Sequence, residues 1–360
     1  MSGTDVARLR LIRTHGIGPV GYRQLLARYG TAEAALDALP MLARRGGGQA
    51  PRVPALSDIT AEMTRTERLG ARYLFLGDVD YPRPLAEIDN APPALIWRGD
   101  LSLAARPCVA IVGARNASAA ACRFARMLGH DLAEQGATVV SGLARGIDTA
   151  AHQGALAAGG TIGVIASGID VVFPPENGAL QEEVATRGLL LAEQPPGTEP
   201  RARHFPYRNR IIAGLCQGTV VVEAAPKSGS LITARLATEM GREVMAVPGS
   251  PLDPRAQGCN GLIREGATLV QSAADVLELL RPIDPRAVRS PGSDYAPPPP
   301  EDASDADRRR VTDLLGPVAV SVDELIRQAG LTTAVVQTVL LELELAGRIE
   351  RHAGGRVSLI

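Results

Sequence analysis

The N-terminal segment combines helical periodicity with a short glycine-rich interruption. Apolar residues recur at helical spacing over 4–14 and again over 19–29, so the pattern predicts two amphipathic helices around HGIGPVG. Two short helices joined by glycines are typical of a helix-hairpin-helix. The run RRGGGQAPRVP at 44–54 is dense in Gly and Pro and predicts a loop. We expect a small helical domain over residues 1–70.

The middle of the chain alternates short aliphatic runs with helical stretches. The expected strands read VAIV, TVVS, TIGVIA, TVVVEA and VMAV in chain order. Between them the periodicity predicts helices over 118–135, 147–158 and 230–241. Runs of consecutive aliphatic residues indicate strands buried on both faces, and their alternation with helices indicates a parallel sheet built from right-handed crossovers. The sequence thus predicts a Rossmann-like α/β domain over 75–280.

A proline-rich stretch separates this domain from the C-terminal part of the chain. Residues 282–304 are rich in proline among acidic and small residues, which favours an extended linker. The pattern beyond it predicts three helices, over 306–315, 321–329 and 332–346. They are followed by an alternating segment around a Gly-Gly pair, which predicts a hairpin. We therefore expect a winged-helix domain over 305–360.

Composition changes this picture only in part. The 360-residue chain has a formal net charge of −1, so nucleic-acid binding requires a local basic patch rather than a basic field over the whole protein. Its four cysteines lie far apart, which predicts neither a metal site nor a disulfide framework and suits a reducing cytoplasm. The sequence predicts no signal peptide and no membrane span. We expect a cytoplasmic protein without a cofactor.

The turn after the first strand of the central domain is a candidate anion site. In VAIVGARNAS, backbone N–H groups from Gly113 to Ser118 lead into a helix, and Arg115 lies beside them. A phosphate suits such a helix N-terminus. The turn lacks the further glycines of a dinucleotide fingerprint, which disfavours a dinucleotide. The alternative is a plain strand-to-helix turn with a solvated arginine.

A second candidate is a basic loop segment with interleaved aromatic residues, EPRARHFPYRNRIIAGL. Guanidinium groups bind phosphates and aromatic rings stack on unpaired bases, so this pattern favours a single-stranded nucleic acid. A solvated surface loop is the plainer interpretation. The residues concerned are Arg201, Arg203, Phe205, Tyr207, Arg208 and Arg210.

Three further motifs have both a structural and a functional interpretation. In KSGSLITA, Lys227 precedes a helix that we expect to begin near Ser230, which either contacts a phosphate or is only the N-cap. Asp148 and His152 lie four residues apart on one predicted helix, which favours a hydrogen bond between them over a hydrolytic pair. The glycines of HGIGPVG either contact DNA phosphates or pack against protein.

Taken together, the motifs resemble the DprA/Smf family. VGARNAS, SGLARGID, ASGIDVVFPPEN, FPYRNRIIAGL, VVVEA with SGSLITA, and GREVMAVPGS with GCNGLIREGA occur in the family's order between about residues 80 and 275. The resemblance implies a non-catalytic, extended Rossmann domain that binds single-stranded DNA and forms a homodimer. It also implies displacement of single-strand-binding protein and loading of the RecA recombinase in natural transformation.

The same resemblance assigns site residues. Arg115 matches the pocket arginine of the family's Gly-x-Arg turn. The flanking helical and winged-helix domains resemble the SAM-like and variable modules of longer members. Ala202 and Pro175 stand where relatives frequently carry lysine. The family's FPxRNR segment is matched by Phe205, Arg208, Asn209 and Arg210.

Two other classes of function stay open at this point. A nucleotide phosphoribohydrolase of the LOG type would use a PGGxGT loop with a nearby glutamate; PGGxGT is absent, but Glu223 precedes KSGSLITA. A winged-helix regulator of duplex DNA would depend on the C-terminal domain, where few residues over 332–346 are basic.

Overall fold

The computed structural model describes residues 2–280, 301–352 and 354–360. They fall into two compact units. The central unit begins at Glu62, and the terminal unit combines the chain up to Ala61 with the C-terminal segment. Most of the linker predicted over 282–304 lies outside the described residues, and the predicted domain limits stay predictions.

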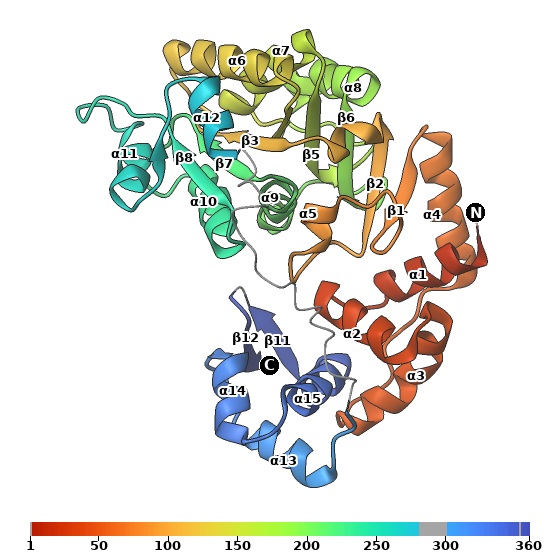
Figure 1. Cartoon of the computed structure of the whole chain (residues 1–360). Coiled ribbons are helices and arrows are strands. Elements are labelled where there is room, and N and C mark those ends of the chain that lie inside the picture. The colour runs from red at the N-terminus through yellow and green to blue at the C-terminus, as the bar shows by residue number, and fades with distance from the viewer. Residues whose placement is uncertain (1, 281–300, 353) are drawn as a thin grey trace, which may run out of the picture. The chain divides into compact units, whose positions relative to one another are not determined.

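One nine-stranded sheet forms the frame of the central unit (Figure 1). Its spatial order is β1-β2-β6-β5-β4-β3-β7-β8-β9. The seven strands from β6 to β9 in this order are parallel, whereas β1 and β2 pair antiparallel at one edge. The strands are β1 (Arg72–Phe75), β2 (Ala94–Gly99), β3 (Cys108–Val112), β4 (Thr138–Ser141), β5 (Thr161–Gly168), β6 (Leu189–Gln194), β7 (Gly218–Val221), β8 (Glu243–Ala246) and β9 (Thr268–Leu269).

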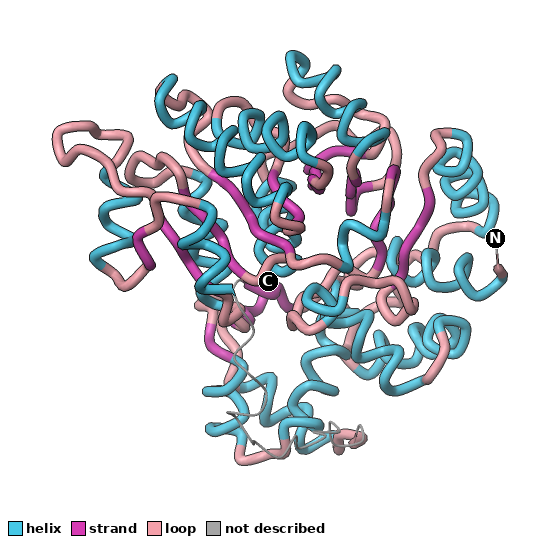
Figure 2. Tube along the Cα trace, turned by 45° about the horizontal axis from the view of Figure 1, so that its top comes forward, coloured by secondary structure: helices cyan, strands magenta, loops and turns pink. Residues whose placement is uncertain are grey.

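Helices cover both faces of this sheet (Figure 2). The core on one face joins the sheet to α6, α7 and α12, and the core on the other joins it to α5, α9 and α10. The inner strands β3, β4 and β5 are buried along their whole length, as the aliphatic runs predict. The helices are α4 (Leu56–Arg68), α5 (Arg83–Ala86), α6 (Ala119–Glu134), α7 (Ile147–Ala158), α8 (Gly178–Arg187), α9 (His204–Leu215), α10 (Gly229–Glu239), α11 (Gln257–Arg264) and α12 (Ala273–Leu280), with 3-10 turns η1 (Leu101–Ala105) and η2 (Pro175–Asn177).

The predicted Rossmann-like fold is confirmed, with two differences. Strands β6 and β9 and the antiparallel pair β1 and β2 extend the sheet beyond the five strands that the aliphatic runs predict. The prediction that the basic segment is a loop is wrong in part, because α9 begins within it at His204. Pro206 does not prevent this helix, since proline is tolerated in a first helical turn, where backbone N–H groups lack intrahelical partners.

The terminal unit contains the predicted N-terminal helices and the predicted winged helix. α1 (Gly3–Arg13) and α2 (Pro19–Tyr29) enclose HGIGPVG, and a further helix, α3 (Ala32–Arg45), follows them. The RRGGGQAPRVP loop begins in the last turn of α3 and ends before α4. The winged helix consists of α13 (Asp305–Asp313), α14 (Val322–Ala329) and α15 (Thr333–Leu345), with strands β10 (Val320–Ser321), β11 (Ile349–His352) and β12 (Arg356–Leu359).

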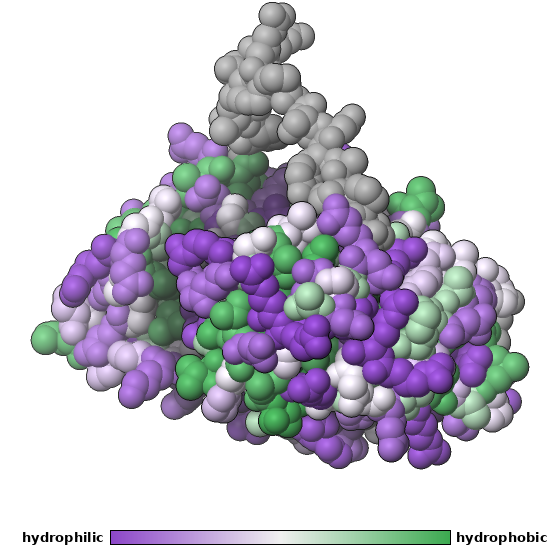
Figure 3. All heavy atoms as spheres, turned by 90° about the horizontal axis from the view of Figure 1, so that it is seen from below, coloured by the Kyte–Doolittle hydropathy of each residue, from purple (hydrophilic) through white to green (hydrophobic). Residues whose placement is uncertain are grey.

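Large apolar side chains are mostly enclosed in these cores. On the face shown in Figure 3, hydrophobic areas are small and separated by hydrophilic ones, as on most globular surfaces. Among the described residues, no helix has the length and apolar character needed to cross a bilayer.

Candidate nucleic-acid interface

The carboxyl ends of the parallel strands meet at one edge of the central sheet. The chain order reverses beside β3, which has β4 on one side and β7 on the other. In open α/β sheets, ligands bind in the crevice outside such a switch point. The loops that follow β3 and β7 carry several of the candidate residues, so this edge is the candidate interface.

The loop after β3 presents Arg115 at this edge. Gly113 lies so close to α7 that an added Cβ would be 2.5 Å from Ile147 Cγ1. Gly146 has a φ of +75°, and a Cβ there would be 2.3 Å from the Ala114 carbonyl oxygen. These glycines hold the loop against the start of α7. The Arg115 side chain is nevertheless exposed and available to a ligand.

Helix α9 brings a second cation to the same place. Arg208 lies on the helical face that also carries Ile211 and Leu215, and packing of this face against the sheet leaves Arg208 only 6% exposed. Its Nη1 donates to the Val164 carbonyl oxygen at 3.3 Å. The guanidinium fits because residue 142 is glycine: a Cβ there would lie 1.2 Å from Arg208 Nη1.

A buried carboxylate compensates the buried Arg208. Burial lowers the pKa of Arg208, the negative charge of Asp148 opposes that shift, and the positive charge of Arg115 adds to it. Asp148 accepts hydrogen bonds from the backbone N–H groups of Gly142 and Ala144 at 3.1 and 3.3 Å. Burial raises the pKa of Asp148, while Arg208 acts to lower it. Asp148 therefore supports the position of Arg208.

The hydrogen bond predicted between Asp148 and His152 is wrong. The Asp148 carboxylate is taken up by the backbone of the turn after β4, and His152 Nδ1 lies 2.7 Å from Thr161 Oγ1 on β5. Burial lowers the pKa of His152 to about 3, so the ring is neutral near pH 7. Asp148 and His152 therefore form their hydrogen bonds with neighbouring elements rather than with each other across one turn of α7.

Phe205 joins the two arginines into one cluster. Arg115 Cζ lies 5.4 Å from the centroid of its ring and Arg208 Cζ lies 6.0 Å from it, both within cation–π range. Phe173 packs edge-on against the same ring, with 5.8 Å between centroids and 61° between ring planes. We call these four residues the arginine–phenylalanine cluster.

Phe173 was missed by the sequence analysis. It lies in the loop between β5 and η2 and is 40% exposed, an unusual exposure for a large apolar ring. The loop is anchored because Asn177 Nδ2 donates to the Leu143 carbonyl oxygen and to Thr149 Oγ1. The available signal was an aromatic residue five positions after a buried strand, in the loop at the carboxyl edge.

The N-terminus of α6 already holds an anion. The Ser118 backbone N–H donates to Glu223 Oε2 at 2.8 Å, and the Ser118 hydroxyl caps the helix by accepting from Ala121 N–H. A phosphate expected at this end of the helix would meet the carboxylate of Glu223, which lies just after β7. Glu223 and Ser118 are 105 residues apart in the sequence, so a local sequence pattern does not reveal this contact.

The loop after β7 places Lys227 at the same edge. Lys227 is exposed and has a φ of +65°, a left-handed conformation that is uncommon for residues other than glycine and often occurs at functional sites. The expected N-cap at Ser230 is wrong. Ser228 is the N-cap, and its Oγ accepts from the backbone N–H of Ser230, which is buried in the first turn of α10.

The remaining candidates differ in their surroundings. Arg201 and Arg203 are exposed just before α9, and Asn209 is half-buried within it. Arg210 is buried on another face of α9, where it forms an ion pair with Glu193 and donates to the Asn90 carbonyl oxygen at 2.6 Å. The structure therefore does not bring Arg210 into the arginine–phenylalanine cluster.

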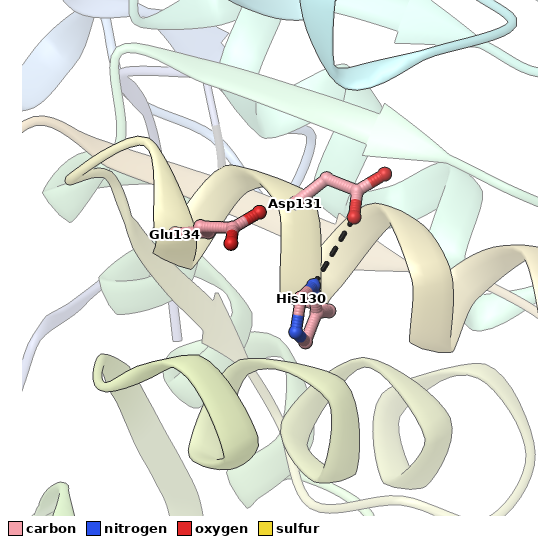
Figure 4. Close-up of side chains that lie close together, drawn as sticks. All are labelled: His130, Asp131 and Glu134. Atoms are coloured by element: carbon pink, nitrogen blue, oxygen red, sulfur yellow. Dashed lines mark hydrogen bonds and ion pairs between the residues drawn. The ribbon is translucent and has the colours of Figure 1, made fainter.

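One group of possible metal ligands occurs among the described residues, although the sequence predicted none. The ligand atoms of His130, Asp131 and Glu134 lie within 4.8 Å of one another (Figure 4). His130 Nδ1 and Asp131 Oδ1 are already 3.1 Å apart. The group lies on the last turns of α6, far along the helix from the Ser118 end, and we assign it no role at the interface.

Comparison with known families covers nearly the whole chain. The profile described as DNA recombination-mediator protein A matches residues 72–281. Profiles described as DprA-like N-terminal HHH domain and DprA winged helix domain match residues 3–64 and 295–355. The chain is also 32% identical to the protein Smf of Synechocystis over 95% of both chains.

Two of the solved structures that resemble this one are DNA processing proteins. DNA processing protein A from Streptococcus pneumoniae aligns with a TM-score of 0.65 and 38% identity, covering 77% of this chain and 98% of that one. DNA processing protein A from Helicobacter pylori, described for its single-stranded DNA binding mode, aligns with a TM-score of 0.53 and 29% identity over 58% of this chain and 95% of that one.

Proposed function

Because this chain belongs to the DprA/Smf family of DNA recombination-mediator proteins, we propose that it binds single-stranded DNA at the carboxyl edge of its central sheet. The observation that carries the proposal is the arginine–phenylalanine cluster at the switch point. Guanidinium groups bind phosphates, and an exposed ring can stack on an unpaired base. The Helicobacter pylori relative, described as binding single-stranded DNA, supports the same ligand.

We assign the residues of this interface different roles. Arg115 and Lys227 are exposed and contact phosphates, with Arg201 and Arg203 extending the positive surface along the strand. Phe205 and the more exposed Phe173 contact bases. Arg208 and Asn209 support the ring and its helix from within, and Gly113, Ser118 and Ser230 shape the two loops. Arg210 is structural in this proposal, because its charge is already paired with Glu193.

We further propose that the bound strand is handed to the RecA recombinase. In this role the protein displaces single-strand-binding protein and protects incoming DNA during natural transformation, as a homodimer formed through the central unit. The family membership supports these steps, and the interface proposed above would be the surface at which such an exchange begins.

We propose binding rather than catalysis at this edge. A phosphoribohydrolase would need a carboxylate directed at its nucleotide, and Glu223 is the candidate from the sequence. Its Oε2 instead accepts the Ser118 N–H and the residue is 7% exposed. The carboxylate thus serves the N-terminus of α6, which favours the binding function.

Comparing DNA forms tests the proposal directly. Electrophoretic binding with single-stranded and duplex DNA of equal length should show a strong preference for the single strand, and a nucleotide-release assay alongside should show no hydrolysis. Arg115→Ala should weaken single-strand affinity by about 1–3 kcal/mol without unfolding the protein, since it removes a charge-assisted phosphate contact. Affinity should fall with salt at a slope near −0.7 per neutralised phosphate.

Arg123→Ala is the matched control, because Arg123 is an exposed arginine further along α6. Its affinity should equal that of the wild type. A folded Arg115→Ala protein with wild-type affinity would remove Arg115 from the interface, and equal affinity for duplex and single strands would contradict the function itself.

A further inference from the structure

Helix α15 of the terminal unit is apolar on two sides. Val336, Val339 and Leu343 face the core of the winged helix. Leu341 and Leu345 belong instead to the core formed by the N-terminal helices, and each is less than 5% exposed. A helix that serves only the core of its own domain needs one apolar stripe. The second stripe is buried because the N-terminal helices cover it.

Polar contacts border this second stripe. Gln24 Nε2 on α2 donates to Gln337 Oε1 on α15 at 2.7 Å. Arg28 and Arg45 reach the carboxylate of Asp302, at 3.2 and 3.0 Å. Partial burial acts to raise the pKa of the Asp302 carboxyl. The nearby arginines have the larger effect, and the pKa is lowered. The contact therefore has an apolar centre and a polar border, as protein interfaces do.

The glycine-rich loop after α3 is explained by the same contact. A Cβ on Gly46 would lie 2.0 Å from the Glu342 carbonyl oxygen, and a Cβ on Gly48 would lie 2.6 Å from the Ala346 carbonyl oxygen. Arg348 Nη1 donates to the Gly46 carbonyl oxygen at 3.3 Å. Only residues without a side chain allow the end of α3 to approach the end of α15 this closely.

The hairpin glycines of HGIGPVG face α15 as well. A Cβ on Gly18 would lie 3.9 Å from Glu344 Oε1, and one on Gly21 would lie 3.6 Å from Leu341 Cδ1. A glutamate carboxylate thus lies beside the hairpin, where its negative charge would repel a DNA phosphate. The third helix of a helix-turn-helix domain ordinarily enters the DNA groove. Here α15 and the hairpin, which both belong to motifs that bind DNA in other proteins, contact each other.

We propose that the second face of α15 is a protein-docking surface whose partner is the N-terminal helical segment of the same chain, so that neither α15 nor the hairpin reads DNA. The winged helix joins the two ends of the chain into one unit. This inference does not rest on the proposed function of the central unit, because its residues all belong to the terminal unit.

A cross-linking experiment on the full chain tests the docking. Gln24→Cys and Gln337→Cys are introduced in a Cys122→Ser background, since the other three native cysteines are buried. A short bifunctional thiol reagent should link the pair in most molecules. The control pair combines Gln24→Cys with Gln328→Cys, whose native glutamine lies on α14 and hydrogen bonds to Glu324, and it should link far less. Equal cross-linking of both pairs would overturn the proposal.

DNA binding by the cross-linked chain separates docking from a masked DNA site. Locking the contact should change the affinity for single-stranded and for duplex DNA by less than about twofold, since DNA does not compete for α15. Duplex binding that is present in the unlinked chain and lost in the linked one would show that DNA displaces the N-terminal helices, and would overturn the proposal.

A glycine pair provides a second, independent measurement. Gly46→Val should raise amide hydrogen exchange at Leu341 and Leu345 at least tenfold, because the new side chain cannot fit against Glu342. Gly316→Val in the winged helix has open space around its Cβ and should leave this exchange unchanged. Wild-type protection from exchange in Gly46→Val would contradict the docking. If that variant does not fold, the cross-linking experiment tests the proposal without it.

Discussion

At the scale of single residues, the exposed ring of Phe173 invites a test of base stacking. We expect Phe173→Ala to weaken binding of an oligothymidine by about 1–3 kcal/mol, because stacking on one base contributes roughly that amount. Binding of an abasic strand of the same length should not change, since its phosphates remain. Fluorescence anisotropy with both strands measures the difference.

Two substitutions at the same position serve as controls. Phe173→Tyr keeps the aromatic face and should retain wild-type affinity, whereas Phe173→Leu keeps apolar bulk without a ring and should behave like the alanine variant. Equal losses on the base-bearing and abasic strands would mean that Phe173 only shapes the loop.

Asp148 allows a stability prediction, also at the residue scale. Asp148→Ala should lower the free energy of unfolding by about 3–5 kcal/mol, because it leaves the buried Arg208 without its compensating charge. Urea denaturation measures this change. Asp131→Ala, at a partly exposed position on α6, should cost less than about 1 kcal/mol. A similar small loss for Asp148→Ala would show that Arg208 needs no buried counter-charge.

At the scale of elements, the N-terminus of α6 shows how a helix end can be filled from within. Glu223 supplies the negative charge that this end of the helix dipole favours. Glu223→Gln keeps an acceptor oxygen but removes a negative charge close to the proposed phosphate path. We expect single-strand affinity to increase by about 0.3–1 kcal/mol, the usual magnitude for a charge at a helix end.

The affinity of Glu223→Gln is measured against Glu134→Gln, which changes an exposed carboxylate at the other end of α6. The control should bind like the wild type. Weaker binding by a folded Glu223→Gln protein would indicate that the carboxylate supports the interface rather than opposing the DNA.

At the scale of the whole molecule, the central unit should bind single-stranded DNA by itself. A fragment of residues 62–280 should keep affinity within about threefold of the full chain, because the arginine–phenylalanine cluster and its supports lie inside it. It begins at 62 rather than at the predicted limit of 75, since Glu62 Oε1 accepts a 2.6 Å hydrogen bond from Tyr73 and β1 begins at Arg72. A folded fragment that loses its affinity would assign part of the interface to the terminal unit.

The isolated winged helix is expected to behave differently from the central unit. Sequence alone predicts that residues 305–360 bind DNA negligibly, because acidic side chains outnumber basic ones over 306–350. The structure adds that this fragment would expose Leu341 and Leu345, which the N-terminal helices normally cover. We expect it to associate with itself or with a separate N-terminal fragment, which analytical ultracentrifugation would show.

The sequence by itself determined the architecture and the main loop of the interface. Aliphatic runs such as Cys108–Val112 and the helical stripes between them are local patterns, and burial of apolar surface follows them directly. Arg115 could be placed at the sheet edge for the same reason, because it directly follows a buried strand. The arginines of the basic segment could be selected as candidates but not ranked.

Only the tertiary structure decided which charges are available. Arg208 and Arg210 are two positions apart, yet one adjoins Phe205 and the other is neutralised by Glu193. The electrostatic state of such groups depends on burial and on partners brought together by packing, which local periodicity does not encode. Glu223 fills the N-terminus of α6 from 105 residues away, and Gln24 meets Gln337 across 313, because close packing brings together segments that are distant in the chain.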